Sequence, residues 1–263
     1  MRILHIRTIS LVLNIFLGCI LFSIFACGKE NYTPKKYMGL KGKIVNIRDS
    51  VYNFPWGYKE LGSVVISDFD TEGNVIKDIK YNADSSFIDL NEYVYKENIL
   101  YSTKGQMHAG KDVIIYTSER ITTEDGTLKY KESNNNQQWI KEVKTTGKYH
   151  MEYSEGEYGH TKEEVWADNN NNIIKDKIVT VSNESKFPNG TYTFMCVDKL
   201  KYDKNGNVTE SIRIEDKDTV TTVYSYHQYD NYGNWTEGRV EINESPENRP
   251  YKKLIKRTIT YAE

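Results

Sequence analysis

Two groups of polar residues have types and spacings that metal chemistry could use. Asp168 opens a run of asparagines that places oxygen ligands at alternate positions, as calcium loops do. Such a loop needs Gly at its sixth position and Glu at its twelfth, where this chain has Ile173 and Val179. The run is therefore interpreted as a hairpin turn.

The second group is rich in histidine and glutamate. His150 and His160 stand among Glu152, Glu155, Glu157, Glu163 and Glu164. No HxxxH or HxH spacing brings two imidazoles to one metal, so we predict a solvated acidic patch and no metal site. The isolated His108 and His227 are expected on strand faces.

The sequence offers few candidate residues or motifs for nucleophilic catalysis. Cys196 lies in the apolar segment 191–197 without a glycine elbow, which favours a buried structural cysteine. No GxSxG, P-loop or GxGxxG motif occurs. Charged residues make up 27% of the chain, so any pair of carboxylates chosen without geometry would be a chance pair. We expect no enzyme activity and no cofactor, with a hydrolase using a dispersed acidic site left open.

The remaining reactive candidate is Cys27, which ends the N-terminal apolar segment. A basic start is followed by an uncharged run from Thr8 to Gly28, expected as a helix over about residues 8–25. The run closes on the sequence Ile-Phe-Ala-Cys at 24–27, which resembles a lipobox. We predict a signal peptide over 1–26 and a palmitate-bearing Cys27, with an uncleaved transmembrane anchor or ordinary secretion as the alternatives.

The mature chain would then be anchored to the membrane through the lipid on Cys27. Residues 27–37 form a short polar tether, and 38–263 form the folded domain. Position 28 is Gly and not Asp, so the usual inner-membrane retention signal is absent. This favours the outer membrane, in either a periplasmic or a surface-facing orientation.

Composition points to sheets and away from nucleic acid. The chain has 263 residues, a formal charge of −2, 38% hydrophobic residues and 21 tyrosines. A ring can pack on one face of a sheet while its hydroxyl reaches water. No basic stripe is present, so a nucleic-acid partner is not expected.

One turn pattern recurs: aromatic-Asp-x-x-Gly-Asn-apolar. It occurs at 69–75, 202–208 and 229–235, with weaker copies at 101–107, 122–128 and 167–173. Asp can accept backbone N–H bonds at the start of a turn, and Gly tolerates a positive φ where the chain reverses. Gly73, Gly206 and Gly233 are therefore predicted to lie in turns with positive φ, with strands on both sides.

A second turn type, near 82–85 and 215–218, alternates with the first. The spacing predicts an all-β antiparallel β-meander of repeated hairpins, forming a large twisted or curled sheet after the signal helix. The turns, the opening 38–45 and the ending 257–261 resemble bacterial envelope lipoproteins with YD/Rhs-like repeats. The resemblance covers most of 38–261, implies an architecture without catalytic residues, and is weakest over 134–195.

The sequence narrows the range of possible functions without identifying one. Trp56 and Tyr58 lie in a Pro- and Gly-containing segment and could stack on a glycan or contact a protein partner; they could equally cap the core. The leading hypothesis is a non-catalytic binding or scaffold module at the outer membrane, attached through Cys27. The alternative is an immunity or accessory partner of a toxin or a glycan-uptake system.

Overall fold

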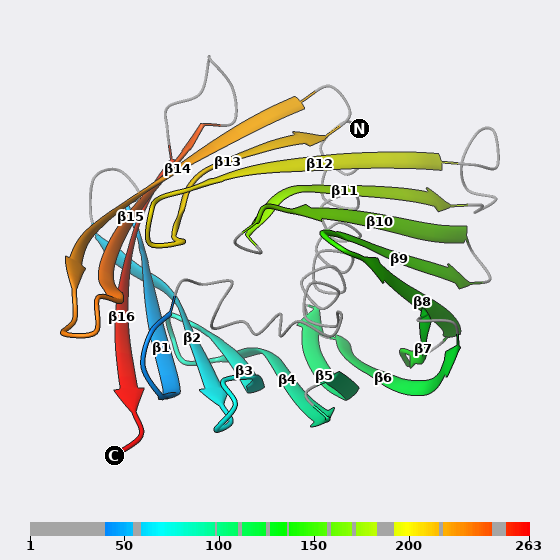
Figure 1. Cartoon of the computed structure of the whole chain (residues 1–263). Helices are drawn as coiled ribbons and strands as arrows, with labels where there is room; N and C mark the ends of the chain where they lie inside the picture. Colours follow the sequence, from blue (N-terminus) through cyan, green and yellow to red (C-terminus); the bar gives the residue numbers. More distant parts are fainter. Residues whose placement is uncertain are drawn as a thin grey trace.

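The computed structural model describes residues 40–54, 59–97, 99–109, 112–124, 127–135, 137–156, 159–169, 172–182, 192–215, 218–243 and 251–263. The predicted helix over 8–25 lies outside these ranges. The described residues form sixteen β-strands in one closed antiparallel barrel (Figure 1). The strands are β1 Ile44–Asn53, β2 Glu60–Phe69, β3 Val75–Asn82, β4 Phe87–Lys96, β5 Ile99–Ala109, β6 Asp112–Glu124, β7 Thr127–Ser133, β8 Gln138–Thr146, β9 Tyr149–Gly156, β10 Gly159–Ala167, β11 Ile173–Ser182, β12 Tyr192–Tyr202, β13 Val208–Glu215, β14 Asp218–Tyr229, β15 Trp235–Asn243 and β16 Tyr251–Tyr261.

Closure of the sheet corrects the predicted fold. Each strand pairs with its neighbours in sequence, and β1 also pairs antiparallel with β16, with Ile47 opposite Ile259 and Asp49 opposite Arg257. The prediction of an open twisted or curled sheet was therefore wrong. An open sheet would leave two edges with unpaired N–H and C=O groups, and closure removes both.

The alternating strand directions give the barrel two different ends. One end, the turn rim, carries the turns 70–74, 168–172, 203–207 and 230–234 together with both ends of the described chain. At the opposite end, the loop rim, β1, β11 and β15 end and β2, β12 and β16 begin. The repeated motif therefore belongs to one rim only among the described turns.

Each motif turn is closed by its own aspartate. In the first copy Asp70 Oδ1 accepts the Asn74 backbone N–H at 2.7 Å, and Asp70 Oδ2 accepts the Asn74 side-chain amide at 2.9 Å. The same two bonds recur from Asn172 to Asp168 and from Asn207 to Asp203. The aspartate thus replaces backbone partners that the reversal removes.

Backbone geometry confirms the predicted role of the three motif glycines. The φ angles are 88° at Gly73, 84° at Gly206 and 80° at Gly233. Strands flank each of these turns. Only a residue without a Cβ adopts this region freely, so the glycine is what permits the tight reversal.

One of the weaker motif copies turns out differently. Residues 101–107 lie inside β5, where Gly105 is paired with Tyr116 of β6, so that copy is a strand and not a turn. A Cβ on Gly105 would lie 2.0 Å from the Tyr116 ring, which explains the glycine without any turn. In the copy at 122–128, residues 125–126 lie outside the described ranges. The segment 134–195, where the resemblance is weakest, continues the same hairpin pairing through its described strands.

Apolar side chains form a band on the inner wall near the turn rim. Ile47, Tyr130 and Val143 are at most 2% exposed, and the Tyr130 hydroxyl donates to the Leu100 carbonyl at 3.0 Å. The band continues through Leu40, Ile44, Phe69, Val75, Tyr93, Leu100 and Leu128. Because no second layer covers the convex side of a barrel, this buried face is the concave one.

Candidate binding site inside the barrel

Most residues singled out from the sequence lie at the edges of the structure or beyond it. Cys27, Trp56 and Tyr58 fall outside the described residues. Gly73, Gly206 and Gly233 lie at the turn rim and hold no functional group. The candidate site therefore has to be built from the inner wall, whose side chains alternate with those of the outer face along every strand.

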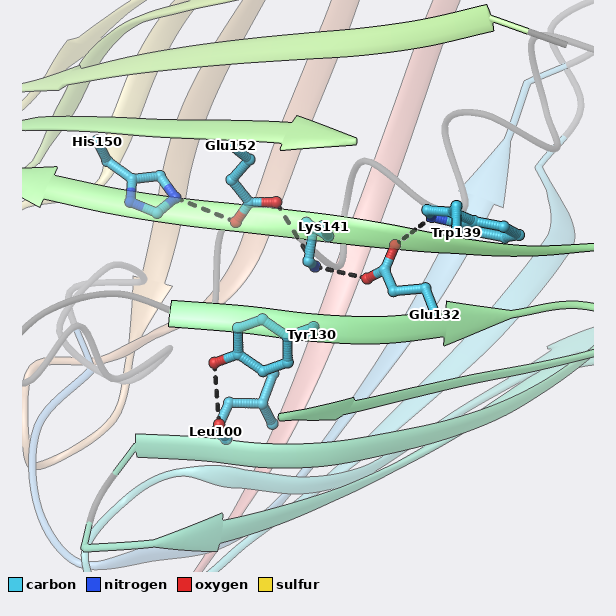
Figure 2. Close-up of polar contacts among 7 residues, drawn as sticks. All are labelled: Leu100, Tyr130, Glu132, Trp139, Lys141, His150 and Glu152. Carbon is cyan, nitrogen blue, oxygen red and sulfur yellow. Dashed lines mark hydrogen bonds and ion pairs between the residues drawn. The ribbon is translucent and has the colours of Figure 1, made fainter. Parts of the chain in front are cut away.

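A charged network lies on the inner wall of β7, β8 and β9 (Figure 2). Lys141 places its ammonium 2.8 Å from Glu132 and 3.6 Å from Glu152, while the Trp139 indole donates to Glu132 at 2.6 Å. His150 Nε2 lies 3.0 Å from the other Glu152 oxygen. Burial alone would lower the pKa of Lys141, but the charges of the two glutamates raise it. Lys141 is thus held as a cation and serves as an ion-pair partner rather than a nucleophile.

These positions correct the predicted acidic patch. Glu152 is 4% exposed and Glu163 is 3% exposed, and the two stand directly opposite each other on β9 and β10. Only the alternate residues face outwards, such as Lys162 and Glu164, whose charged groups lie 3.1 Å apart. The sequence pattern was treated as one surface, whereas the two-residue period of a strand divides it between two faces.

The charged network on β7, β8 and β9 continues along the inner wall into β11, β12 and β13, and the whole row of charged residues is called the charged belt. Asp176 stands opposite Asp198, and Arg213 makes two 2.9 Å hydrogen bonds to the Asp198 carboxylate. Burial and then the charge of Asp198 raise the pKa of Asp176 to about 7. Asp176 therefore retains its proton into the neutral range.

Cys196 lies beside this belt and is buried, as predicted. The residue is 4% exposed and is a free thiol. Burial raises the pKa of the thiol to about 12, with Asp198 adding to the effect. A thiol with this pKa holds almost no thiolate at neutral pH, so the structure gives it no nucleophilic character.

An aromatic cavity occupies the inner wall between β12 and β1. Its volume is about 240 Å³, and its lining includes Tyr224, Tyr226 and Trp235. Leu200, Val240 and Ile255 supply aliphatic surface, and the polar lining residues are Asp49, Asn207, Arg239 and Arg257. Strands that are distant in sequence converge here because β16 pairs with β1.

Arg257 is the most heavily constrained polar residue of this cavity. Its Nε and Nη2 donate to the Asp49 carboxylate at 2.8 and 2.7 Å, and its guanidinium carbon lies 3.6 Å from the Trp235 ring centroid. The residue is 6% exposed, and Nη1 is buried without a hydrogen-bond partner among the described residues. A buried donor left in this state costs about 1–3 kcal/mol, which a ligand oxygen would recover.

The two regions differ in what they can do. In the belt, the cations Lys141 and Arg213 are paired with carboxylates of the belt itself. The cavity combines ring faces, the Arg257–Asp49 pair and the buried donor Arg257 Nη1, a composition that suits a small molecule. Among the described residues no cluster of His, Cys, Asp or Glu has the arrangement of a metal site. Nor does the described part of the chain contain a helix long and apolar enough to cross a membrane.

Sequence reasoning missed this cavity because its parts are far apart in the chain. Val220, Tyr224 and Tyr226 could be placed on one strand face from their spacing. Asp49 and Arg257 lie 208 positions apart, and their pairing depends on barrel closure. The sequence signal for this cavity is an inward-facing Arg on β16 together with an Asp on β1. That signal can be interpreted only when the two strands are known to be adjacent.

Comparisons with known proteins give neither a family nor a close relative. No protein-family model and no curated protein matches the sequence. A solved structure of a porin-like protein from Bacteroides vulgatus shares 8% identity, covering 84% of this chain and 99% of its own, with a TM-score of 0.42. A porin-like protein from Bacteroides uniformis shares 10% identity over 85% of this chain and 100% of its own, with a TM-score of 0.31.

Proposed function

We propose that this chain is a lipid-anchored binding or scaffold module of the cell envelope, without catalytic activity, whose barrel stands outside the bilayer. The observation that carries the proposal is the charge on the outer face of the barrel. A barrel embedded in lipid presents an apolar band about 25 Å tall, and charges at its centre are strongly unfavourable. Anchoring through Cys27 then accounts for attachment to a membrane.

Ion pairs occur on the outer face in several sectors of the barrel. Lys129 of β7 lies 3.1 Å from Glu142 of β8, and both side chains are at least a third exposed. Lys256 of β16 is half exposed and lies 3.6 Å from Glu237 of β15. With the Lys162–Glu164 pair on β10, these charges lie within the strands rather than at the rims. In these sectors the outer face suits contact with water rather than with lipid.

A protease experiment separates tethering from insertion. A cleavage site for a sequence-specific protease is inserted into the tether, within 28–37, of the full chain expressed in a Gram-negative host. Cleavage of isolated membranes should release the folded barrel into the detergent-free supernatant. Retention of the cleaved barrel in the membrane pellet would contradict the proposal, and untreated membranes serve as the control.

Lipid attachment has its own test. Labelled palmitate should enter the wild-type chain and should not enter the Cys27→Ala variant, because the thiol is the acceptor. Equal labelling of both chains would show that the lipid is elsewhere or absent.

An acid-dependent hydrolase is the second candidate, and one observation favours it. Asp176 keeps a proton near neutrality beside Asp198, which accepts two hydrogen bonds from Arg213, and two neighbouring carboxyl groups are what acid–base hydrolysis uses. Neither carboxyl lines the cavity, and Asp176 is 6% exposed, so a substrate has no described path to it. Turnover of a glycoside by wild type but not by Asp176→Asn would favour the hydrolase over the binding module.

A further inference from the structure

The cavity beside Arg257 carries an inference about the chemical class of its occupant. Its charge balance is the first step. Asp49 takes two donors of Arg257, so the guanidinium and the carboxylate neutralise each other within the wall. Arg239 of β15 also lines the cavity, but its neighbours Gly238 and Val240 are buried on the inner wall, so alternation along the strand directs the exposed Arg239 side chain outwards. An anionic ligand would therefore approach Asp49 with Arg257, already paired to Asp49, as the inward-facing cation of the lining. The cavity therefore favours an uncharged ligand that brings one acceptor oxygen to Arg257 Nη1.

The ring faces are the second step. Tyr226 packs on Trp235 with ring centroids 5.2 Å apart, and its hydroxyl is committed to the Val208 carbonyl at 2.6 Å. Burial raises the pKa of both Tyr226 and Tyr224, so both phenols keep their protons. Aromatic faces carry negative potential and attract polarised C–H groups, such as those of a hydroxylated ring.

Gly238 is the third step, because it keeps the ring in place. It stands opposite Tyr226 on β15, and a Cβ there would lie 3.2 Å from the Tyr226 ring. The absence of a side chain lets the ring lie against the wall and leaves the volume of the cavity open. The cavity, at about 240 Å³, suits a small molecule rather than a polymer segment buried whole.

We propose that this cavity binds a neutral hydroxylated ring the size of one saccharide unit, with a ring oxygen or hydroxyl on Arg257 Nη1 and a C–H face against Tyr224 and Tyr226. The assignment rests on the proposed binding role of the barrel. To that binding role it adds the position of the site, the chemical class of the ligand, and Arg257 as the residue that selects a neutral ligand over an acidic one. Longer glycans would be recognised by one terminal unit.

Binding is measured on the barrel released from membranes, with glucose, galactose and N-acetylglucosamine as neutral probes and glucuronate as the charged comparison. Saturation-transfer NMR reports contact, and tryptophan fluorescence titration gives the Kd at millimolar sugar. At least one neutral sugar should bind, and glucuronate should bind about tenfold more weakly or worse.

Two variants locate the site. Arg257→Lys keeps a cation for Asp49 but removes Nη1, and Val240→Phe fills the cavity while leaving the Arg257–Asp49 pair intact. Each should weaken sugar binding about tenfold or more. Lys256→Ala, on the outer face and half exposed, is the matched control and should bind as wild type does.

The outcomes are decisive in each direction. If Arg257→Lys does not fold, Val240→Phe alone tests the location, and unchanged binding in that variant overturns the site. Tighter binding of glucuronate than of every neutral sugar overturns the ligand class. Absence of binding by a folded, protease-released wild-type barrel also overturns it, while the release itself leaves envelope anchoring standing.

Discussion

Individual residues of the inner wall show how much charge this barrel holds away from water. Glu152 and Glu163 face each other on neighbouring strands, and so do Asp176 and Asp198. Directly opposed like charges destabilise a sheet. Lys141 and Arg213 offset part of this repulsion through their ion pairs. Protonation of one carboxyl offsets more, so the stability of the barrel is linked to pH.

Asp176 provides the test of that linkage. Burial and the charge of Asp198 raise its pKa from 3.8 to about 7, so the folded protein retains a proton that the unfolded chain releases near pH 4. Stability should therefore fall as pH rises from about 4 to 7, by at most about 1.4 kcal/mol per pH unit. In Asp176→Asn, the amide cannot ionise and that loss should disappear.

Urea unfolding at pH 5 and pH 8 measures the effect. Asp176→Asn should match wild type within about 1 kcal/mol at pH 5 and exceed it by about 1–3 kcal/mol at pH 8. Asp112→Asn, at the exposed start of β6, is the control and should leave the pH dependence unchanged. Identical pH dependence in wild type and Asp176→Asn would show that Asp176 is ionised in the folded state.

Cys196 gives a second prediction at the residue scale. Because its thiol is buried and its pKa is raised to about 12, a thiol reagent should react slowly with the folded protein. The reaction should become fast in urea, when the barrel opens. Rapid labelling under native conditions would instead revive Cys196 as a nucleophile.

Hairpins are the scale at which the sequence is most informative. The Asp-x-x-Gly-Asn spacing identifies turns because Asp, Gly and Asn each have a local physical task there, and the structure has those bonds at Asp70 and Asp203. The same reasoning fails at Gly105, which is a glycine for a different reason: the Tyr116 ring occupies the space of its side chain. A glycine alone therefore does not distinguish a turn from close cross-strand packing.

Gly206 allows the turn argument to be measured. Its φ is 84°, where an added Cβ is disfavoured, so Gly206→Ala should lower the free energy of unfolding by about 1 kcal/mol or more. Gly156 on β9 is the matched control: a Cβ there meets Trp139 at 3.6 Å, an ordinary contact. Chemical denaturation of both variants should show a loss only for Gly206→Ala. Equal losses would mean that the positive φ is not what the glycine supplies.

At the scale of the whole molecule, closure was the feature that the sequence did not reveal. Periodicity shows that strands follow one another, but the pairing of β1 with β16 joins segments that share no local pattern. The pairing of β1 with β16 is called the seam. The features that depend on the seam were missed as well, including the Asp49–Arg257 pair and the cavity beside it. Local rules predict hairpins, whereas the number of strands and their closure depend on the sum of all twists and staggers.

The fourth motif turn has a role in the seam that the other turns lack. In the turn 230–234 the Asn234 side-chain amide donates to the Lys41 carbonyl at 2.8 Å and to the Tyr261 hydroxyl at 2.7 Å. The Lys41 N–H donates back to Asn234 Oδ1 at 2.6 Å, and the Tyr261 hydroxyl donates to Asp230. One turn thus binds the segment before β1 and the end of β16 together.

Asn234→Ala should therefore weaken the barrel at the seam between β1 and β16. Asn234 is 2% exposed, and its replacement removes three hydrogen bonds across the seam. Asn207→Ala is the control, because among the described residues the Asn207 side-chain amide bonds within its own turn, to Asp203 at 3.0 Å. Asn234→Ala should be less stable than Asn207→Ala by about 1–3 kcal/mol. Hydrogen exchange should speed up in β1 and β16 of Asn234→Ala while β7 to β10 keep their protection. Equal stability, with equal exchange at the seam, would show that the strand pairing closes the barrel without this turn.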